Sequence, residues 1–212
     1  MKGVMKTQAP TFFKSIFKLQ NPIFKNIIFE ALNNTIGVLS LSEKSDNILM
    51  WGHYANSHKG FVIGFDKTHS FFDQRKKEGE IQGVARKVNY LRERPKITLY
   101  DSSLNNDENM KVWIEKFIWF KNIDWKYEKE WRMIYTFKDK EDIVTKVDTN
   151  IFLFPLPVDC IKSIIFGCKM SEENKRRLRT VLKSHSKYHH IQIFQAVEDE
   201  KEFTVNIVKL NR

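Results

Sequence analysis

Cysteine is scarce in this chain, and its scarcity excludes a disulfide framework or a cysteine-rich zinc cluster. The two cysteines among the 212 residues, Cys160 and Cys168, are too few and too oddly spaced for either arrangement. We interpret them as cytosolic thiols in or near a strand. The histidines also lack a metal-binding spacing, because His53 and His58 lie five residues apart and fall on different faces of a helix. We therefore expect no metal site.

Long apolar runs and secretory features are missing as well. No run approaches the ~20 apolar residues of a membrane-spanning helix. The N-terminus lacks an apolar segment followed by a small-residue cleavage site, so we expect a cytoplasmic protein. No repeat and no linker rich in Gly, Ser or Pro divides the chain. We therefore predict one domain over residues 1–212, with an N-terminal helical segment (1–36) and an α+β core (37–212).

Hydrophobic residues and positive charge are plentiful. Hydrophobic residues make up 42% of the sequence, including 17 Phe and 5 Trp, which is a globular composition. Residues 11–33 carry aromatic and aliphatic side chains at helical spacing, interrupted at Pro22, and we interpret them as a helical cover over a sheet. Lysines among these aromatics leave a membrane surface as the alternative. The net charge of +10 favours contact with polyanions such as nucleic acid.

Residues 37–66 predict a strand, a helix and a second strand. In the first strand, 38–42, Ser40 and Ser42 share one face and two leucines the other. The helix, about 46–57, is predicted to begin after Ser45 as N-cap and to place Trp51 on a sheet. The second strand, 61–66, is predicted to have an apolar face that consists of Phe61, Ile63 and Phe65.

Further elements alternate irregularly along the chain, which favours an α+β fold with mixed, mainly antiparallel sheets and flanking helices. Strands are predicted at 84–90, 126–137, 151–154 and 161–166, and a hairpin at 191–197 and 203–210. Helices are predicted at 109–120, with Met110, Trp113, Phe117 and Phe120 as its buried stripe, and from Ser171 to Ser184. This last helix carries Lys175, Arg176, Arg177 and Arg179, either as a solvated face or as a phosphate-binding one.

The segment 126–137 alternates cleanly, which predicts one strand. Glu128, Glu130 and Arg132 share a face in this prediction, so the two carboxylates are expected ~7 Å apart. One interpretation is a surface strand with weak cross-strand ion pairs. The other is a catalytic carboxylate anchored by the apolar opposite face.

Several motifs in combination resemble an uncharacterised bacterial family known as domain of unknown function 2971. They are LSLSE, LMWGHYANSHKGFVIGFD, a VNY strand followed by a proline, WKYEKEWR, and IIFG, and they extend from Gly37 to Gly167. Their order is also similar to that of ADP-ribosyltransferases of the arginine–serine–glutamate type. Ser40-Leu41-Ser42 matches the Ser-x-Ser strand of those enzymes, and Glu128-Lys129-Glu130 matches the strand that opens with Glu-x-Glu.

The resemblance implies an ADP-ribosyltransferase-like fold and an NAD-dependent transferase or NAD glycohydrolase, acting as a toxin-like effector in bacterial conflict or phage defence. Glu130 would stabilise the ribosyl cation and Glu128 would orient the acceptor, which is a protein or nucleic acid. NAD binding would involve Ser40 and Ser42, together with His53, Tyr54 and Arg132. A neutralising partner protein is a further implication.

The sequence departs from this pattern before Ser40, where the family's Tyr-Lys-Tyr-Arg-like strand and Asn-Asp-Pro-Phe segment have no counterpart. The resemblance thus implies either a shortened form or one in which another arginine, Arg86 or Arg132, replaces the arginine that holds the NAD phosphates. The competing hypothesis is a basic nucleic-acid-binding or protein-interaction module without catalysis.

Overall fold

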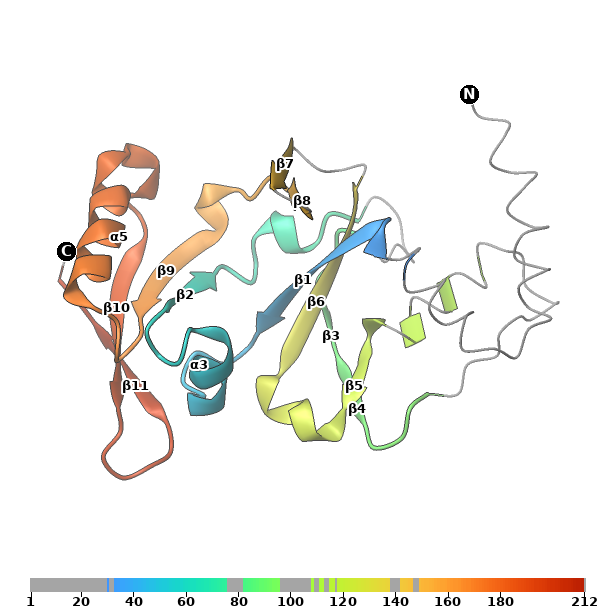
Figure 1. Cartoon of the computed structure of the whole chain (residues 1–212), viewed down its shortest axis with the longest axis horizontal. Coiled ribbons are helices and arrows are strands. Elements are labelled where there is room, and N and C mark those ends of the chain that lie inside the picture. Colours follow the sequence, from blue (N-terminus) through green and yellow to red (C-terminus); the bar gives the residue numbers. More distant parts are fainter. Residues whose placement is uncertain are drawn as a thin grey trace.

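The structure of the protein is a computed structural model, which describes residues 30, 33–75, 82–95, 108, 111–112, 115–116, 118–137, 142–146 and 149–211 (Figure 1). The predicted N-terminal helices therefore lie almost wholly outside the described residues. The same holds for Met110, Trp113 and Phe117 of the predicted helix 109–120.

A three-stranded antiparallel sheet contains the predicted Ser-x-Ser strand. Its order is β1-β6-β3, with bounds Ile36–Ser42, Glu130–Thr136 and Arg86–Lys87. β1 pairs with β6 over its whole length, and this register sets Ser42 opposite Glu130 and Ser40 opposite Arg132. On one face Leu39 and Leu41 pack around the fully buried Met133, as the alternation of β1 predicts. Ser40 and Ser42 therefore lie on the opposite face.

A four-stranded sheet forms the other main layer. Its order is β11-β10-β9-β2, with bounds Val205–Lys209, Gln192–Glu198, Ile161–Phe166 and Phe61–Phe65. β9 is antiparallel to β2 and parallel to β10, and β10 forms the predicted antiparallel hairpin with β11. The near-continuous apolar sequence of β9 is explained by its interior position, since both of its faces are covered.

Two helices cover the two faces of this sheet. Helix α5, Glu172–Ser184, packs Leu182 against Phe166 and Ile193 on one face. On the other face helix α3, Ile48–Tyr54, packs Trp51 against Ile165 and Ala196. In Figure 1 α5 lies along the outer side of β9 and β10, whereas α3 lies on the side towards β1 and β6. A cluster around Phe72, Met133 and Cys160 joins the two sheets.

The remaining strands form two pairs. β4 and β5 are parallel, with bounds Asn89–Leu91 and Phe120–Asn122. β7 and β8 are antiparallel, with bounds Asp142–Lys146 and Thr149–Leu153. Four short 3-10 helices complete the described elements, at Ser70–Phe72, Ile123–Glu128, Val158–Cys160 and Ser186–Tyr188. Antiparallel pairing predominates, so the predicted α+β class with mainly antiparallel sheets is confirmed.

Several predicted boundaries are wrong, because of side-chain caps, backbone conformation or strand pairing. Helix α3 is capped by Asn47, not Ser45, since the Asn47 side chain accepts from Leu49 N at 2.9 Å and Met50 N at 3.2 Å. The helix ends before residues 56–58, whose φ angles are 48°, 51° and 67°. The predicted strand 84–90 divides at Val88, because the backbone pairs first with β6 and then with β5. Phe120 begins β5 and does not end a helix.

The predicted apolar face of β2 is wrong for Phe61 and Ile63 but correct for Phe65, which packs against Phe72 after a register shift between Gly64 and Phe65. Phe61 is 41% exposed and Ile63 is 38% exposed, whereas Val62 packs into the core beneath α3. Before that shift, the side of β2 that carries Val62 faces inward, opposite to the prediction. Among the described residues, no helix is long and apolar enough to cross a membrane.

Candidate functional site

The two carboxylates of the Glu-x-Glu motif come from different elements. Glu128 is the last residue of the 3-10 helix Ile123–Glu128, and Glu130 is the first residue of β6. Lys129 between them has φ 44° and ψ 53°, the left-handed conformation. The single strand predicted over 126–137 is therefore wrong before Glu130. The 3-10 helix forms there because Asn122 caps it, with its side-chain oxygen accepting from Asp124 N at 2.8 Å.

Both carboxylates are buried, which contradicts the interpretation of a surface strand. Glu128 is 2% exposed and Glu130 is 7% exposed, and they are the charged residues in the described core. A buried carboxylate requires charged or hydrogen-bonding partners, since an uncompensated charge away from water is very costly. The described surroundings supply such partners to the two carboxylates from three strands and one helix.

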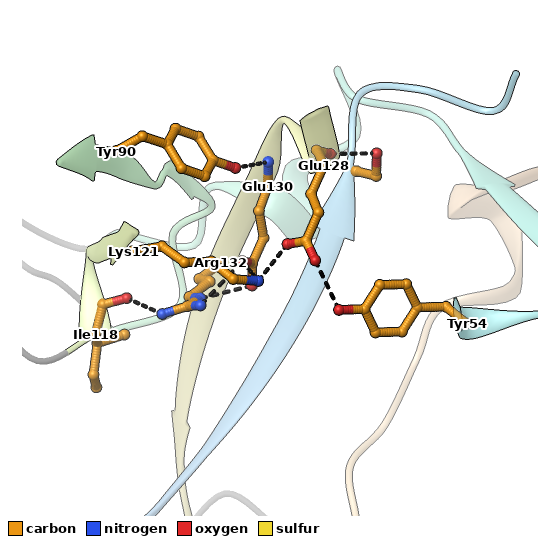
Figure 2. A network of polar contacts seen from close by, with 8 residues as sticks. Tyr54, Tyr90, Ile118, Lys121, Glu128, Glu130 and Arg132 are labelled. Carbon is orange, nitrogen blue, oxygen red and sulfur yellow. Dashed lines mark hydrogen bonds and ion pairs between the residues drawn. The ribbon is translucent and has the colours of Figure 1, made fainter. Parts of the chain in front are cut away.

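Two cations bind the pair (Figure 2). Lys121, on β5, donates from Nζ to Glu128 Oε2 and, at 3.0 Å, to Glu130 Oε2. Arg132 donates two hydrogen bonds to Glu130, from Nε to Oε1 at 2.7 Å and from Nη2 to Oε2 at 3.0 Å. Its Nη1 donates to the carbonyl oxygen of Ile118. Two negative and two positive charges thus form a formally neutral cluster.

Hydroxyl groups complete this cluster. Tyr54 donates from α3 to Glu128 Oε1 at 2.7 Å, and Ser42 Oγ donates to the Glu128 carbonyl oxygen at 2.7 Å. Tyr90 Oη accepts from Glu130 N at 2.8 Å (Figure 2). Ser40, opposite Arg132 on β1, also contributes to lowering the pKa of Glu130 through its hydroxyl. The backbone and the side chains of both glutamates are therefore fixed from several directions.

The pKa values reflect this balance of burial and charge. Burial raises the pKa of Glu130, but hydrogen bonds from Arg132 and Lys121 outweigh it and hold the pKa below its usual value. Burial likewise lowers the pKa of Lys121, yet its bonds to Glu128 and Glu130 leave the net shift upward. The bond to Glu128, with burial, raises the pKa of Tyr54. Glu130 and Lys121 are therefore both charged at neutral pH.

The structure brings most of the predicted site residues together. Ser40, Ser42, Tyr54 and Arg132 all contact the glutamates, as the preceding bonds show. His53 is exposed at the margin of the cluster, with its ring 6.3 Å from that of Trp125 and 6.2 Å from that of Tyr54. It contacts neither carboxylate among the described hydrogen bonds and ion pairs.

The two arginines suggested as phosphate-binding groups have different surroundings. Arg132 lies inside the cluster. Arg86 is opposite Arg132 in the β3–β6 register, but its guanidinium pairs with Glu115 and lies 4.8 Å from the centre of the Trp119 ring. Each guanidinium thus already has an acidic partner within the chain. Within the described ranges, no group of three or more His, Cys, Asp or Glu side chains is arranged to hold a metal ion.

Sequence reasoning missed Lys121, Tyr90 and Trp125. Trp125 is 38% exposed, and Lys121 Nζ lies 4.9 Å from the centre of its ring. The available signal was the isolated lysine in the apolar and aromatic stretch Phe117–Asn122, because a charge in such a stretch needs a buried partner. Tyr90 carried no comparable signal, since a tyrosine in a strand is common.

Comparisons with known proteins bear on one part of the resemblance. The model of a family described as a protein of unknown function (DUF2971) matches residues 50–133, which supports the resemblance to that family. The match includes Tyr54, Lys121, Glu128, Glu130 and Arg132, and it begins after Ser42. No curated protein and no solved structure matches the chain.

Proposed function

We propose that this chain is an NAD-consuming enzyme of the ADP-ribosyltransferase type, with Glu130 as its catalytic carboxylate, acting as an effector in bacterial conflict or phage defence. The observation that carries the proposal is the pairing of the two motifs in one sheet. The Ser-x-Ser strand β1 lies antiparallel to β6, with Ser42 opposite Glu130. Two motifs that are 86 residues apart in sequence, at Ser42 and Glu128, are joined by a hydrogen bond.

The proposed chemistry breaks the bond between the nicotinamide nitrogen and C1′ of the ribose. The bonding electrons leave with nicotinamide, which becomes neutral, and positive charge develops at C1′ and the ring oxygen. The ionised Glu130 stabilises this charge and accepts a hydrogen bond from a ribose hydroxyl. Water or an acceptor nucleophile then bonds to C1′ and loses a proton, giving free or transferred ADP-ribose. Glu128 orients that nucleophile.

The arrangement suits this role because the carboxylate is fixed before substrate binds. Glu130 is held by Arg132 and Lys121, and its backbone is held by Tyr90. A preorganised charge in a water-poor site is worth more than the same charge in water. The same bonds impose a condition: a ribose hydroxyl must reach Glu130 while Lys121 and Arg132 remain bound to it. The side chains of Lys121 and Arg132 are 21% and 17% exposed, so both cations are largely shielded from water.

The test is release of nicotinamide from NAD by the purified chain, measured by chromatography with and without bacterial protein and RNA as acceptors. Glu130→Gln keeps the shape of the side chain and removes its charge, so turnover should fall ~100-fold or more. Glu173→Gln is the matched control, since Glu173 is an exposed ion-paired glutamate on α5. Because Glu130 is buried, the folded fraction of each variant is measured by urea unfolding alongside. A native chain that neither binds nor consumes NAD refutes the proposal.

A second candidate, a basic nucleic-acid-binding module without catalysis, is favoured by the charges on α5. Lys175 pairs with Glu172 and Arg177 with Glu173, so these two cations are largely neutralised. Arg176 and Lys183 are exposed and have no ion pair within the described part of the chain. They are seven residues apart on one helix face, about 10 Å along the axis, which can span neighbouring phosphates.

Nucleic-acid binding measured across salt concentrations tests this candidate. If Arg176 and Lys183 bind phosphates, reversing both charges should weaken binding to duplex DNA. The log–log slope of affinity against salt should then become shallower by ~0.9 for each phosphate that the variant no longer neutralises. Reversal of Lys175 and Arg177 is the control and should change binding much less. Equal weakening in the two variants would indicate general charge attraction and remove the helix face from consideration.

A further inference from the structure

Lys121 occupies a position that no other described cation shares. Its ammonium contacts both buried carboxylates, whereas Arg132 binds both oxygens of Glu130 and neither oxygen of Glu128. Lys121 also comes from a separate sheet, because β5 pairs with β4 and not with β6. The carboxylate pair is therefore joined by a group that the local sequence of β6 does not supply.

The position of Lys121 affects whether the two neighbouring carboxylates can both be ionised. Like charges that share a buried site disfavour each other, and without a compensating cation one carboxylate takes up a proton. The groups that face Glu130 are known from each neighbouring element: Arg132 on β6, Glu128 at the end of the 3-10 helix, Tyr90 on β4, Ser40 on β1 and Lys121 on β5. On β3, Arg86 faces Glu115. Only Lys121, among these, compensates both carboxylates.

We propose that Lys121 is a positioning residue of this site, whose ammonium holds Glu128 and Glu130 close together with both carboxylates ionised. Its catalytic meaning rests on the proposed function, because stabilising a ribosyl cation requires an ionised Glu130. The electrostatic role itself does not depend on that function. Lys121 acts through the carboxylates and is not assigned a contact with substrate.

The experiment compares Lys121→Met with the native chain by carbon NMR of labelled glutamate, and the Glu130 resonance is assigned by its disappearance in Glu130→Gln. Removing a cation in direct contact should raise the pKa of Glu130 by about 1 to 3 pH units. If the chain cleaves NAD, the acid limb of its pH–rate profile should move upward with that pKa. Lys121→Arg should restore both. Lys87→Met is the matched control, since Lys87 pairs with Glu43 beside Trp131 but does not contact the carboxylate pair.

An unchanged Glu130 pKa in Lys121→Met overturns the inference, whether or not the chain consumes NAD. Loss of NAD turnover with unchanged titration would make Lys121 a merely structural tether and also overturns it. Should Lys121→Met fail to fold, the native chain decides: the nitrogen resonance of Lys121 Nζ must shift with the same midpoint as the Glu130 carboxyl. If the Lys121 Nζ resonance does not shift as the Glu130 carboxyl titrates, the proposed interaction between the two groups is refuted. A native chain inactive on NAD refutes the proposed function alone.

Discussion

Replacing Arg132 by methionine removes the bidentate grip on Glu130 and leaves a buried carboxylate with one cationic partner. The side chains of Arg132 and Glu130 are 17% and 8% exposed, so solvent replaces little of the interaction that is removed. Breaking a buried pair by removing one partner typically costs about 3 to 5 kcal/mol. Because Lys121 still contacts Glu130 at 3.0 Å, we expect a loss near the lower end, about 3 kcal/mol.

A double-mutant cycle separates the ion pair from other effects of the substitution. Arg132→Met also leaves the carbonyl of Ile118 without its guanidinium donor, and this cost is present in both the single and the double variant. Glu130→Met/Arg132→Met should therefore be less destabilised than the sum of the two single variants, by about 2 kcal/mol. Urea unfolding, followed by tryptophan fluorescence, gives the four free energies at pH 7.

A cost of Arg132→Met under about 1 kcal/mol, the value of an exposed ion pair, would refute this expectation. A coupling energy near zero between the two residues would refute it equally. Either result would mean that water compensates Glu130, and the burial of the carboxylate pair would not determine its chemistry.

Two further predictions concern pH and the cap of α3. Because the folded-state pKa of Glu130 is below its ordinary value of 4.5, its contribution to stability is complete above that pH and is lost as pH falls through the lower folded value. The native chain should thus lose more stability than Glu130→Gln between pH 5 and pH 3 in urea unfolding, and parallel curves would contradict this. Asn47→Ala should lower the free energy of unfolding by about 1 kcal/mol, whereas Ser45→Ala should change it by less than about 0.5 kcal/mol. A larger loss of stability in Ser45→Ala than in Asn47→Ala would instead support Ser45 as the N-cap, as predicted from the sequence.

Elements with a strong local signal were predictable from the sequence. Ser171 caps α5 and accepts from Asn174 N at 3.3 Å, and the turn at Asp199 between β10 and β11 lies where the pattern indicated. The alternation of β1 correctly placed two serines opposite two leucines. In each case the decisive interaction lies within a few residues along the chain.

Only part of the candidate site could be predicted from the sequence. Some of its interactions join residues that are distant in sequence, and others lie where the alternation of polar and apolar residues wrongly indicated a continuous strand. The alternation of 126–137 concealed the left-handed Lys129, so the proximity of Glu128 and Glu130 was expected for the wrong reason. Lys121 contributes through the pairing of β5 with β4, which local pattern does not specify. Asn47 and Ser45 are equally good caps by residue type, and only the path of the chain selects between them.

Because Lys129 is left-handed, the Glu-x-Glu sequence alone does not determine the backbone conformation between the two glutamates. A lysine in that conformation carries a strain of roughly 1–2 kcal/mol, which glycine would relieve and a β-branched residue would increase. A related chain with valine or isoleucine at this position would favour a straight strand, in which the two glutamates share one face at a spacing of ~7 Å along the backbone. A chain with glycine or asparagine there would keep the turn. The middle residue of the motif, which a Glu-x-Glu search ignores, would then distinguish sites with a turn between the two glutamates from sites with a straight strand.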